Sequence, residues 1–304
     1  MKTEAFTVCS RQDGLPLEVL LTLPEPEEKL RGLVQISHGM CEHKERYLPF
    51  MEYLARHGYG TVIHDHRGHG QNAKEADSLG FFGDETGDAI AADLYQVTEG
   101  IRQRFPDTPI WLFGHSMGSL VARKYLKTHD DQIRGLVLSG APWNNPGAHA
   151  GLVLARGMAK VKGGRYRSRF IHDLADGAFG RAFPDNGWLS ANEENVKAFN
   201  AHPLDGFSFT LNGYMNLFRL VLDVYDDKGW QMKNPSLPVF FVAGEEDPVI
   251  GSRRKWIAEQ DFMRNLGYQN TSGTLYPGMR HEILLERESD RVMDDILAFL
   301  EMPR

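Results

Sequence analysis

The sequence predicts an α/β protein in which helices cover both faces of a mostly parallel sheet. Along most of the 304 residues, short apolar runs of strand length alternate with segments whose apolar residues recur at helical spacing. Such alternation is typical of consecutive strand–helix–strand units. Two further observations support the prediction: a serine between two glycines lies at a strand-to-helix junction, and the alternation stops over residues 143–235.

The individual strands and helices are expected from local patterns. Residues 17–23 alternate polar and apolar side chains, whereas residues 110–113 are apolar throughout, as in a strand that is buried on both faces. Gly58 and Pro106 each end a helical segment. In chain order, the expected strands are 17–23, 32–36, 59–63, 110–113, 135–138, 239–243 and 271–276, and the expected helices are 46–57, 88–105, 119–128, 252–266 and 282–300.

Residues 143–235 break this rhythm. They contain apolar residues at helical spacing, for example Tyr214, Leu217 and Phe218, but no convincing strand–helix–strand unit. Insertions of this kind occur in loops at the functional edge of a rigid scaffold. We therefore expect residues 1–142 and 236–304 to form the α/β core and residues 143–235 to form an inserted helical cap.

The composition limits the possible functions. Hydrophobic residues make up 41% and charged residues 25% of the chain, which is ordinary for a globular enzyme with a sizeable core. A net charge of −7 argues against nucleic-acid binding, which requires basic surfaces. Two cysteines form no disulfide framework, and neither a secretory signal nor an apolar stretch of about 20 residues is present. We expect a cytoplasmic protein.

The segment Gly114–Gly118, with Ser116 at its centre, is the most informative motif. Glycines on both sides allow a sharp turn that lifts the serine hydroxyl clear of the chain. The hydroxyl would lie at a helix N-terminus, where unpaired N–H groups and the helix dipole favour developing negative charge. We therefore expect Ser116 to be a nucleophile, and the alternative is a purely structural turn.

A serine nucleophile requires a base, and the base requires an acid to orient it. His281 lies in a loop containing proline and glycine between the last strand and the last helix, so it can reach the carboxyl edge of the sheet. Asp247 follows a buried strand and precedes Pro248, which prevents an early helix start. We expect His281 to be the base and Asp247 the acid, with Glu246 and Asp223 as weaker alternatives for the acid.

The oxyanion of a tetrahedral intermediate also needs backbone donors, each worth roughly 3 kcal/mol. One candidate is the N–H of Met117, directly after the serine. The second is the N–H of Met40, in the loop that follows strand 32–36. Gly39 precedes it and would allow the backbone to approach a ligand closely, although a plain turn is the alternative.

At these residues the chain resembles the α/β-hydrolase family. Within the family it is most similar to the monoacylglycerol lipase and lysophospholipase-like branch, which is grouped with serine aminopeptidase-like hydrolases. The resemblance spans nearly the whole chain and is weakest across the cap. It implies an eight-stranded sheet, a triad of Ser116, Asp247 and His281, oxyanion donors at Met40 and Met117, and a contact of Glu42 with the glycerol end of a substrate. The segments that carry it are His38–His43, Arg46–Tyr47, Asp65–Gly70, Gly114–Ser119, Gly244–Val249 and Gly278–Glu282.

Two features could indicate other chemistry: a run of histidines and a cysteine in the loop after strand 32–36. This loop also departs from the family pattern. The run His64–His69 is similar to the zinc-binding H-x-H-x-D-H motif, but Gly68 occupies the aspartate position, so we expect a turn after a strand and neither metal nor cofactor. Cys41 could be a reactive thiol, but a small buried residue is the more ordinary interpretation. Met40 and Cys41 stand where lipases of the branch often have two small residues.

The cap carries a local excess of positive charge. Residues 151–170 contain no acidic residue, and their apolar side chains include Leu152, Val153, Leu154 and Met158. The basic residues are Arg156, Lys160, Lys162, Arg165, Arg167 and Arg169. We hypothesise that this stretch rests on an anionic membrane surface and helps to extract acyl chains, and the alternative is a solvated helix face.

The sequence therefore favours a serine hydrolase that cleaves carboxylic esters, with monoacylglycerol-like or lysophospholipid-like lipids as substrates. A serine residue in the turn argues against dehalogenases and epoxide hydrolases that use an aspartate nucleophile. One alternative is an aminopeptidase-type serine peptidase, in which cap carboxylates would pair with a substrate ammonium; the candidates are Asp173, Asp176, Glu193 and Glu194. Another is a non-catalytic binding protein on the same scaffold.

Overall fold

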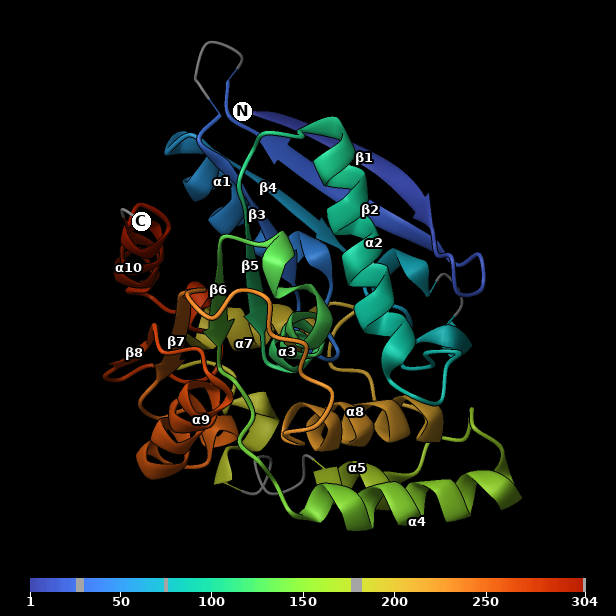
Figure 1. The fold of residues 1–304 in the computed structure, drawn as a ribbon. Helices are drawn as coiled ribbons and strands as arrows, with labels where there is room; N and C mark the ends of the chain where they lie inside the picture. The colour runs from blue at the N-terminus through green and yellow to red at the C-terminus, as the bar shows by residue number, and fades with distance from the viewer. Residues whose placement is uncertain (26–29, 74–75, 176–181, 303–304) are drawn as a thin grey trace.

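The computed structural model describes residues 1–25, 30–73, 76–175 and 182–302. Within these ranges, eight strands form one sheet in the order β1-β2-β4-β3-β5-β6-β7-β8 (Figure 1). β2 is antiparallel to β1 and β4, and all other neighbours are parallel, which confirms the predicted fold class. The strands are β1 (Lys2–Cys9), β2 (Pro16–Leu23), β3 (Gly32–Ser37), β4 (Tyr59–His64), β5 (Ile110–His115), β6 (Gly135–Ser139), β7 (Val239–Gly244) and β8 (Thr271–Tyr276).

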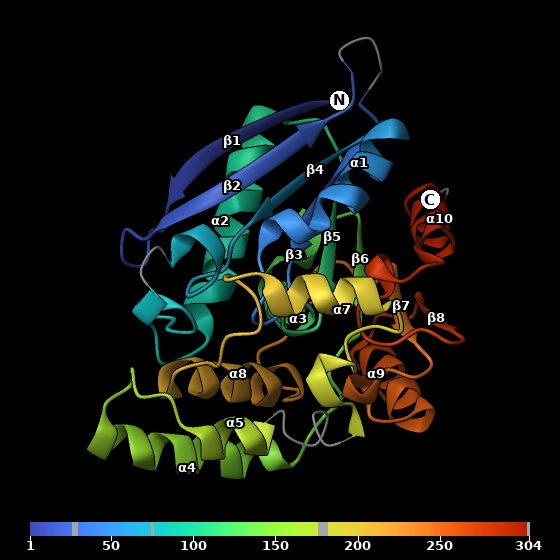
Figure 2. The same ribbon diagram turned by 180° about the vertical axis from the view of Figure 1, so that it is seen from behind.

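Helices cover both faces of the sheet because its central strands are apolar on both sides. Along β5, Leu112 points into one hydrophobic cluster, while Trp111 and Phe113 point into the other. The first cluster is closed by α2 (Asp88–Arg104), α3 (Met117–His129) and α9 (Arg253–Leu266). The second is closed by α1 (Leu48–Arg56) and α10 (Ser289–Leu300), on the opposite face (Figure 2).

The register of the central strands brings their carboxyl ends together. Ser37 of β3 pairs with Gly114 of β5, and His115 of β5 pairs with Ser139 of β6. Functional residues of parallel sheets gather at the carboxyl edge, because the loops that follow neighbouring parallel strands all begin there. The loops after β3, β5, β6, β7 and β8 therefore meet at one place.

Two expected helices begin at least two residues later in the structure, and one strand of the structure is not among the expected elements. β1 was not expected, because its side chains are exposed or half-buried and form no apolar run. The first helix begins at Leu48 rather than residue 46, after a 3₁₀ turn at Lys44–Tyr47. The last helix begins at Ser289 rather than residue 282, because the Glu286 carboxylate accepts N–H groups of Arg280, Ala191 and Asn192 and holds the preceding segment as a separate turn.

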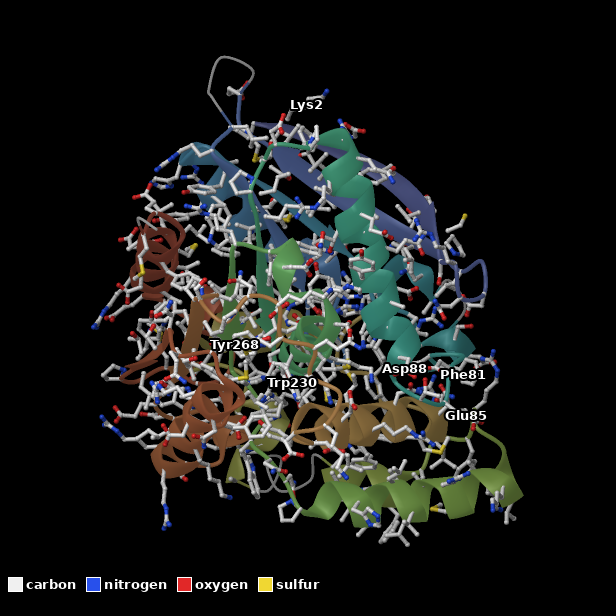
Figure 3. The ribbon with its side chains drawn as sticks, in the orientation of Figure 1. Lys2, Phe81, Glu85, Asp88, Trp230 and Tyr268 are labelled. Atoms are coloured by element: carbon white, nitrogen blue, oxygen red, sulfur yellow. The ribbon has the colours of Figure 1, made fainter. Side chains whose placement is uncertain are left out.

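The segment between β6 and β7 lies along the carboxyl edge of the sheet (Figures 1 and 2). α8 packs on α4 and on α3 of the core. Where the chain returns to the core, the ring of Trp230 packs 6.1 Å from that of Tyr268 (Figure 3). The described elements of this segment, outside residues 176–181, are α4 (Gly147–Lys162), α5 (Arg169–Ala175), η5 (Pro184–Asn186), α7 (Glu193–Ala201) and α8 (Leu211–Val224). We propose that residues 143–235 form a cap on the core, and we use that name below.

Candidate active site

Ser116 occupies a strained turn between β5 and α3. Its φ of 51° and ψ of −120° are rare for a residue with a side chain. The turn is possible because glycine stands on both sides: a Cβ at Gly118 would lie 2.0 Å from the Ser37 carbonyl oxygen, and one at Gly114 would lie 2.6 Å from the Gly118 carbonyl oxygen. The Ser116 N–H donates to the Ser139 carbonyl over 2.9 Å, which fixes the turn against β6.

His281 and Asp247 form a buried pair. Nδ1 of His281 lies 2.9 Å from Oδ2 of Asp247, and the other carboxylate oxygen accepts the Val249 N–H over 2.8 Å. A carboxylate on Nδ1 holds the tautomer whose Nε2 accepts a proton. Of the alternatives, Glu246 lies 3.8 Å from the Nε of Arg280, and Asp223 pairs with lysines of α3.

Contacts around the end of β6 bring this pair to the serine turn. The ring of His115, which precedes Ser116, lies 4.6 Å from the ring of His281. Gly140, which follows the residue whose carbonyl accepts the Ser116 N–H, also borders the pair. A Cβ at Gly140 would lie 2.8 Å from His281 Nδ1 and 3.2 Å from Asp247 Oδ2. The structure therefore places the expected serine, histidine and aspartate at one edge of the sheet.

The electrostatics of the pair favour a basic imidazole. Burial opposes a charge on His281, but the hydrogen-bonded Asp247 carboxylate, together with Glu282 and Glu42, outweighs this effect and raises the pKa of His281 above its usual value. His115 behaves in the opposite way, since burial and the nearby His281 hold its pKa well below the usual value. Of the two adjacent histidines, His281 is therefore the better proton acceptor.

The two expected oxyanion donors lie beside the serine. Met117 is the first residue of α3, where backbone N–H groups have no partner within the helix. Met40 follows Gly39, whose backbone approaches the serine so closely that an added Cβ would lie 3.2 Å from Ser116 Cβ. Met40, Ser116 and Met117 line the same cavity.

That cavity has a volume of about 240 Å³ and is mostly apolar. Core residues form the end that contains Ser116, and the cap supplies most of the remaining wall. The cap side chains that line it include Trp143, Leu174, Trp188, Leu217, Phe218 and Val221. A pocket of this composition fits an extended apolar group whose reacting atom lies near the serine.

Glu42 lies outside this cavity. Its Oε1 accepts from the Gly39 N–H and from the Tyr47 hydroxyl, and its Oε2 accepts from Arg46. It lines a separate cavity of about 20 Å³. Burial raises the pKa of Glu42 to about 7, against the opposing effect of Arg46. The expected contact of Glu42 with a substrate stays a prediction.

The histidines of the run His64–His69 are all fully buried. Burial lowers the pKa of His64 to about 4 and that of His69 to about 3, so both rings are neutral at pH 7. Among the residues that the structure describes, the run does not gather three metal-ligating atoms. Nearby Cys41 is buried, and its thiol donates to the Phe207 carbonyl of the cap.

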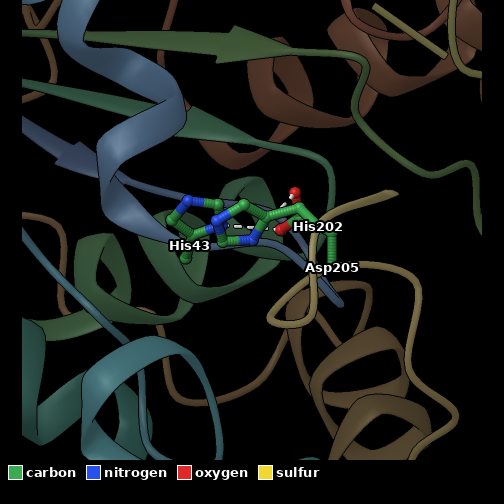
Figure 4. Close-up of side chains that lie close together, drawn as sticks. All are labelled: His43, His202 and Asp205. Atoms are coloured by element: carbon green, nitrogen blue, oxygen red, sulfur yellow. Dashed lines mark hydrogen bonds and ion pairs between the residues drawn. The ribbon is translucent and has the colours of Figure 1, made fainter. Parts of the chain in front are cut away.

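The described residues do gather three such atoms at His43, His202 and Asp205 (Figure 4). The two rings stack with centroids 4.1 Å apart and planes 12° apart, and Nδ1 of His43 lies 2.7 Å from Oδ1 of Asp205. A metal ion lies in the plane of each imidazole that binds it, so two parallel stacked rings do not share one ion. The cluster instead joins the loop after β3 to the cap.

The carboxylates considered for a peptidase are not at the cavity. Asp173, Glu193 and Glu194 are exposed on the cap and do not line the Ser116 cavity. Asp176 lies outside the described residues. Among the helices that the structure describes, none is long and apolar enough to span a bilayer.

Together, the eight-stranded sheet and the serine turn define an α/β-hydrolase fold. The family Serine aminopeptidase, S33, matches residues 28–288, and the chain belongs to this family. The sequence resemblance to α/β-hydrolases is thereby confirmed.

Several relatives match nearly the whole chain. The monoacylglycerol lipase of Mycolicibacterium smegmatis is 26% identical, with 90% of each chain covered. The human monoglyceride lipase is also 26% identical, over 91% of this chain and 84% of its own. Among solved structures, a thermostable carboxyl esterase from Bacillus coagulans in complex with glycerol is 25% identical, has a TM-score of 0.89 and is covered to 98%, with 99% of this chain matched. A monoglyceride lipase from Saccharomyces cerevisiae, with a TM-score of 0.75 and 20% identity over 99% of this chain and 94% of its own, shares the fold.

Proposed function

We propose that the protein is a serine esterase that cleaves monoacyl lipids through an acyl-enzyme. The relatives described above that match nearly the whole chain are lipases and an esterase, and the protein is a carboxylic ester hydrolase. The observation that carries the serine mechanism is the arrangement of the buried His281–Asp247 pair beside Ser116, whose backbone is strained.

The reaction would proceed in two steps. The Ser116 hydroxyl attacks the ester carbonyl while His281 accepts its proton and Asp247 stabilises the resulting imidazolium. The N–H groups of Met40 and Met117 hold the oxyanion, and His281 returns the proton to the leaving alcohol. Water, activated by His281, then attacks the acyl-enzyme, and the fatty acid leaves.

A fluorophosphonate probe tests this mechanism directly. We expect the probe to label the parent protein at Ser116, as identified by peptide mass spectrometry, and not to label the Ser116→Ala variant. Ser139→Ala is a matched control, because Ser139 is a second buried serine at the same sheet edge. Labelling of Ser116→Ala at the parent's rate would overturn the proposed nucleophile.

The apolar wall that the cap supplies supports acyl lipids rather than aminoacyl substrates. A peptidase would need carboxylates near the substrate ammonium, and the described candidates face solvent. We expect p-nitrophenyl acyl esters to be cleaved much faster than aminoacyl anilides. A series of esters of increasing acyl length, compared with monoacylglycerols and lysophospholipids, would assign chain length and headgroup, and faster anilide cleavage would favour the peptidase.

We further propose that the cap contacts anionic membranes. The exposed fractions of Val153, Val161 and Phe170 are 58%, 81% and 59%. Five of the six basic residues in this stretch are exposed around the apolar side chains: Arg156, Lys160, Lys162, Arg165 and Arg169. Arg165 also donates to the Asp77 carbonyl of the core, and Arg167 is half-buried and donates to the Ser208 and Leu79 carbonyls. Apolar side chains surrounded by cations are typical of a surface that inserts at an interface.

Vesicle sedimentation tests this contact. We expect binding to vesicles that contain phosphatidylglycerol, weaker binding to pure phosphatidylcholine, and weakening with added salt. Val161→Asp should reduce binding, whereas Ile257→Asp, at an exposed apolar residue of α9, should not. Equal sedimentation of both variants, or equal binding to both vesicle types at low salt, would contradict the proposal.

A further inference from the structure

The guanidinium of Arg46 lies where the loops that follow β3 and β8 meet. Its Nη1 donates to Oε2 of Glu42 over 3.1 Å and to Oε1 of Glu282 over 2.5 Å, and its Nη2 donates to Oε2 of Glu282 over 2.8 Å. The Arg46 side chain is only 8% exposed. A bidentate hydrogen bond between arginine and a carboxylate fixes the relative orientation of the two groups as well as the distance between them.

The cap reaches the same guanidinium from the other side. Asn195 of α7 accepts from Nη2 of Arg46 over 3.0 Å and donates to Oε2 of Glu282 over 2.6 Å. The ring of Phe199, one turn further along α7, lies 4.9 Å from the guanidinium carbon. Oδ2 of Asp205 lies 3.8 Å from Nε of Arg46. Two segments of the cap therefore contact the cation that joins two loops of the core.

Each of these core loops carries a group that the proposed reaction needs. Glu42 accepts the N–H of Gly39, the residue before the proposed oxyanion donor Met40. Glu282 directly follows His281, and its N–H donates over 2.7 Å to the Leu189 carbonyl of the cap. Arg46 itself lines the cavity of about 20 Å³ and not the cavity that contains Ser116. It therefore acts on the reacting groups through its neighbours.

We propose that Arg46 is a positioning residue that couples the packing of the cap on the core to the alignment of two loops. One is the loop after β3, which carries Met40, and the other is the loop after β8, which carries His281. The inference rests on the proposed serine mechanism. When α7 packs on the core, Asn195 forms hydrogen bonds with both Arg46 and Glu282. When α7 moves away, Arg46 and Glu282 lose that partner, and both loops lose part of their support. The cap then influences turnover as well as substrate binding.

The variant Asn195→Ala tests the coupling from the cap side. For p-nitrophenyl acetate, whose acyl group is too short to fill the apolar cavity, we expect kcat to fall about 10-fold with little change in KM, because misplacing a catalytic loop costs rate rather than binding. Asn200→Ala is the matched control, since this residue lies on the same helix and, within the described residues, its amide bonds to Asn186 and Asp185 of the cap and not to the core. It should turn over like the parent.

Variants of Arg46 test the coupling at its centre. We expect Arg46→Met to lower kcat about 100-fold. Arg46→Lys should lower kcat less, because lysine keeps the positive charge but cannot form the bidentate hydrogen bond with Glu282. Arg56→Met, at an exposed arginine of α1, is the control for substitution as such.

The pH profile separates positioning from loss of structure. Among the described residues, the carboxylates that act most strongly on His281 are Asp247, Glu282 and Glu42, and the ring of His115 packs against its ring. Arg46→Met removes the cation that is paired with Glu282, so the Glu282 carboxylate acts on His281 with less compensation and the acid limb of kcat/KM should move to higher pH. Glu42 contributes less to this shift, because loss of Arg46 favours its neutral form. A merely looser fold would lower the melting temperature and leave that limb in place.

Three results would overturn the inference. The first is Asn195→Ala turning over like Asn200→Ala. The second is a higher KM at unchanged kcat in the Arg46 variants, and the third is an acid limb that does not move in Arg46→Met. If Arg46→Met does not fold, the pair of asparagine variants decides. Probe labelling of Ser116 is measured in the same preparations. No labelling in the parent would refute the serine mechanism and the inference with it. Labelling of the parent, together with unchanged turnover in Asn195→Ala, would refute the inference alone.

Discussion

Buried neutral histidines should make the protein sensitive to mild acid, and His64 offers the clearest test. It is fully buried at the end of β4. Within the part of the chain that the structure describes, neither of its ring nitrogens has a hydrogen-bond partner. Burial lowers the pKa of His64 to about 4. In the unfolded chain, a histidine titrates near 6.5, so between these values only the unfolded state binds the proton.

The size of the effect follows from this difference in proton binding. Because the unfolded state holds one more proton in this window, the free energy of unfolding falls as the pH falls, by about 1.4 kcal/mol per pH unit. Between pH 7.5 and pH 5, His64 alone should cost about 2 kcal/mol of stability. His38, with a pKa of about 4, acts in the same direction. Glu42 and Glu259 act in the opposite direction, because burial raises the pKa of each to about 7.

These opposing contributions make the difference between parent and variant the quantity to measure. In His64→Phe, an aromatic ring remains for the edge-on contact with His66, and the titrating group is gone. Urea unfolding at several pH values from 7.5 to 5 should show that the variant loses about 2 kcal/mol less stability than the parent over this range. His149→Phe, at an exposed residue of α4, is the control and should follow the parent, since water solvates its ring in both states. Parallel losses of stability in His64→Phe and the parent would refute the reasoning.

Other predictions concern the reaction itself. Ser116→Ala should lower kcat for p-nitrophenyl butyrate by about 10⁶-fold with an unchanged unfolding midpoint, and residual turnover near the parent's would contradict the assignment. Asp247→Asn should lower kcat by about 10⁴-fold, because the amide no longer holds the required tautomer of His281; a loss of less than tenfold would favour another acid. Burial opposes protonation of His281 but Asp247 raises its pKa, so kcat/KM should fall as the pH drops through a value above 6.5, and a limb below 6.5 would argue against that pair. Gly140→Ala should lower kcat about 100-fold by pushing on the His281 ring, and normal turnover would show that the ring has room to move.

Local patterns predicted much of the fold and the three residues proposed as the triad. A buried parallel strand needs a continuous apolar run, so β3 to β7 are visible in the sequence. The serine turn is equally local, since glycines at 114 and 118 are required by contacts within the turn and with the adjacent strand end. β1 was missed because an edge strand with exposed side chains has no such run.

The sequence alone therefore determined the strands from β2 to β8, the serine turn and the side chains able to serve as base and acid, because each depends on a few consecutive residues. Only the tertiary structure decided what surrounds them. Arg46 and Glu282 are 236 positions apart and meet because sheet register brings the loops after β3 and β8 to one edge. The insertion then lays Asn195 against both. Such contacts depend on how distant segments pack, and no local pattern records that packing.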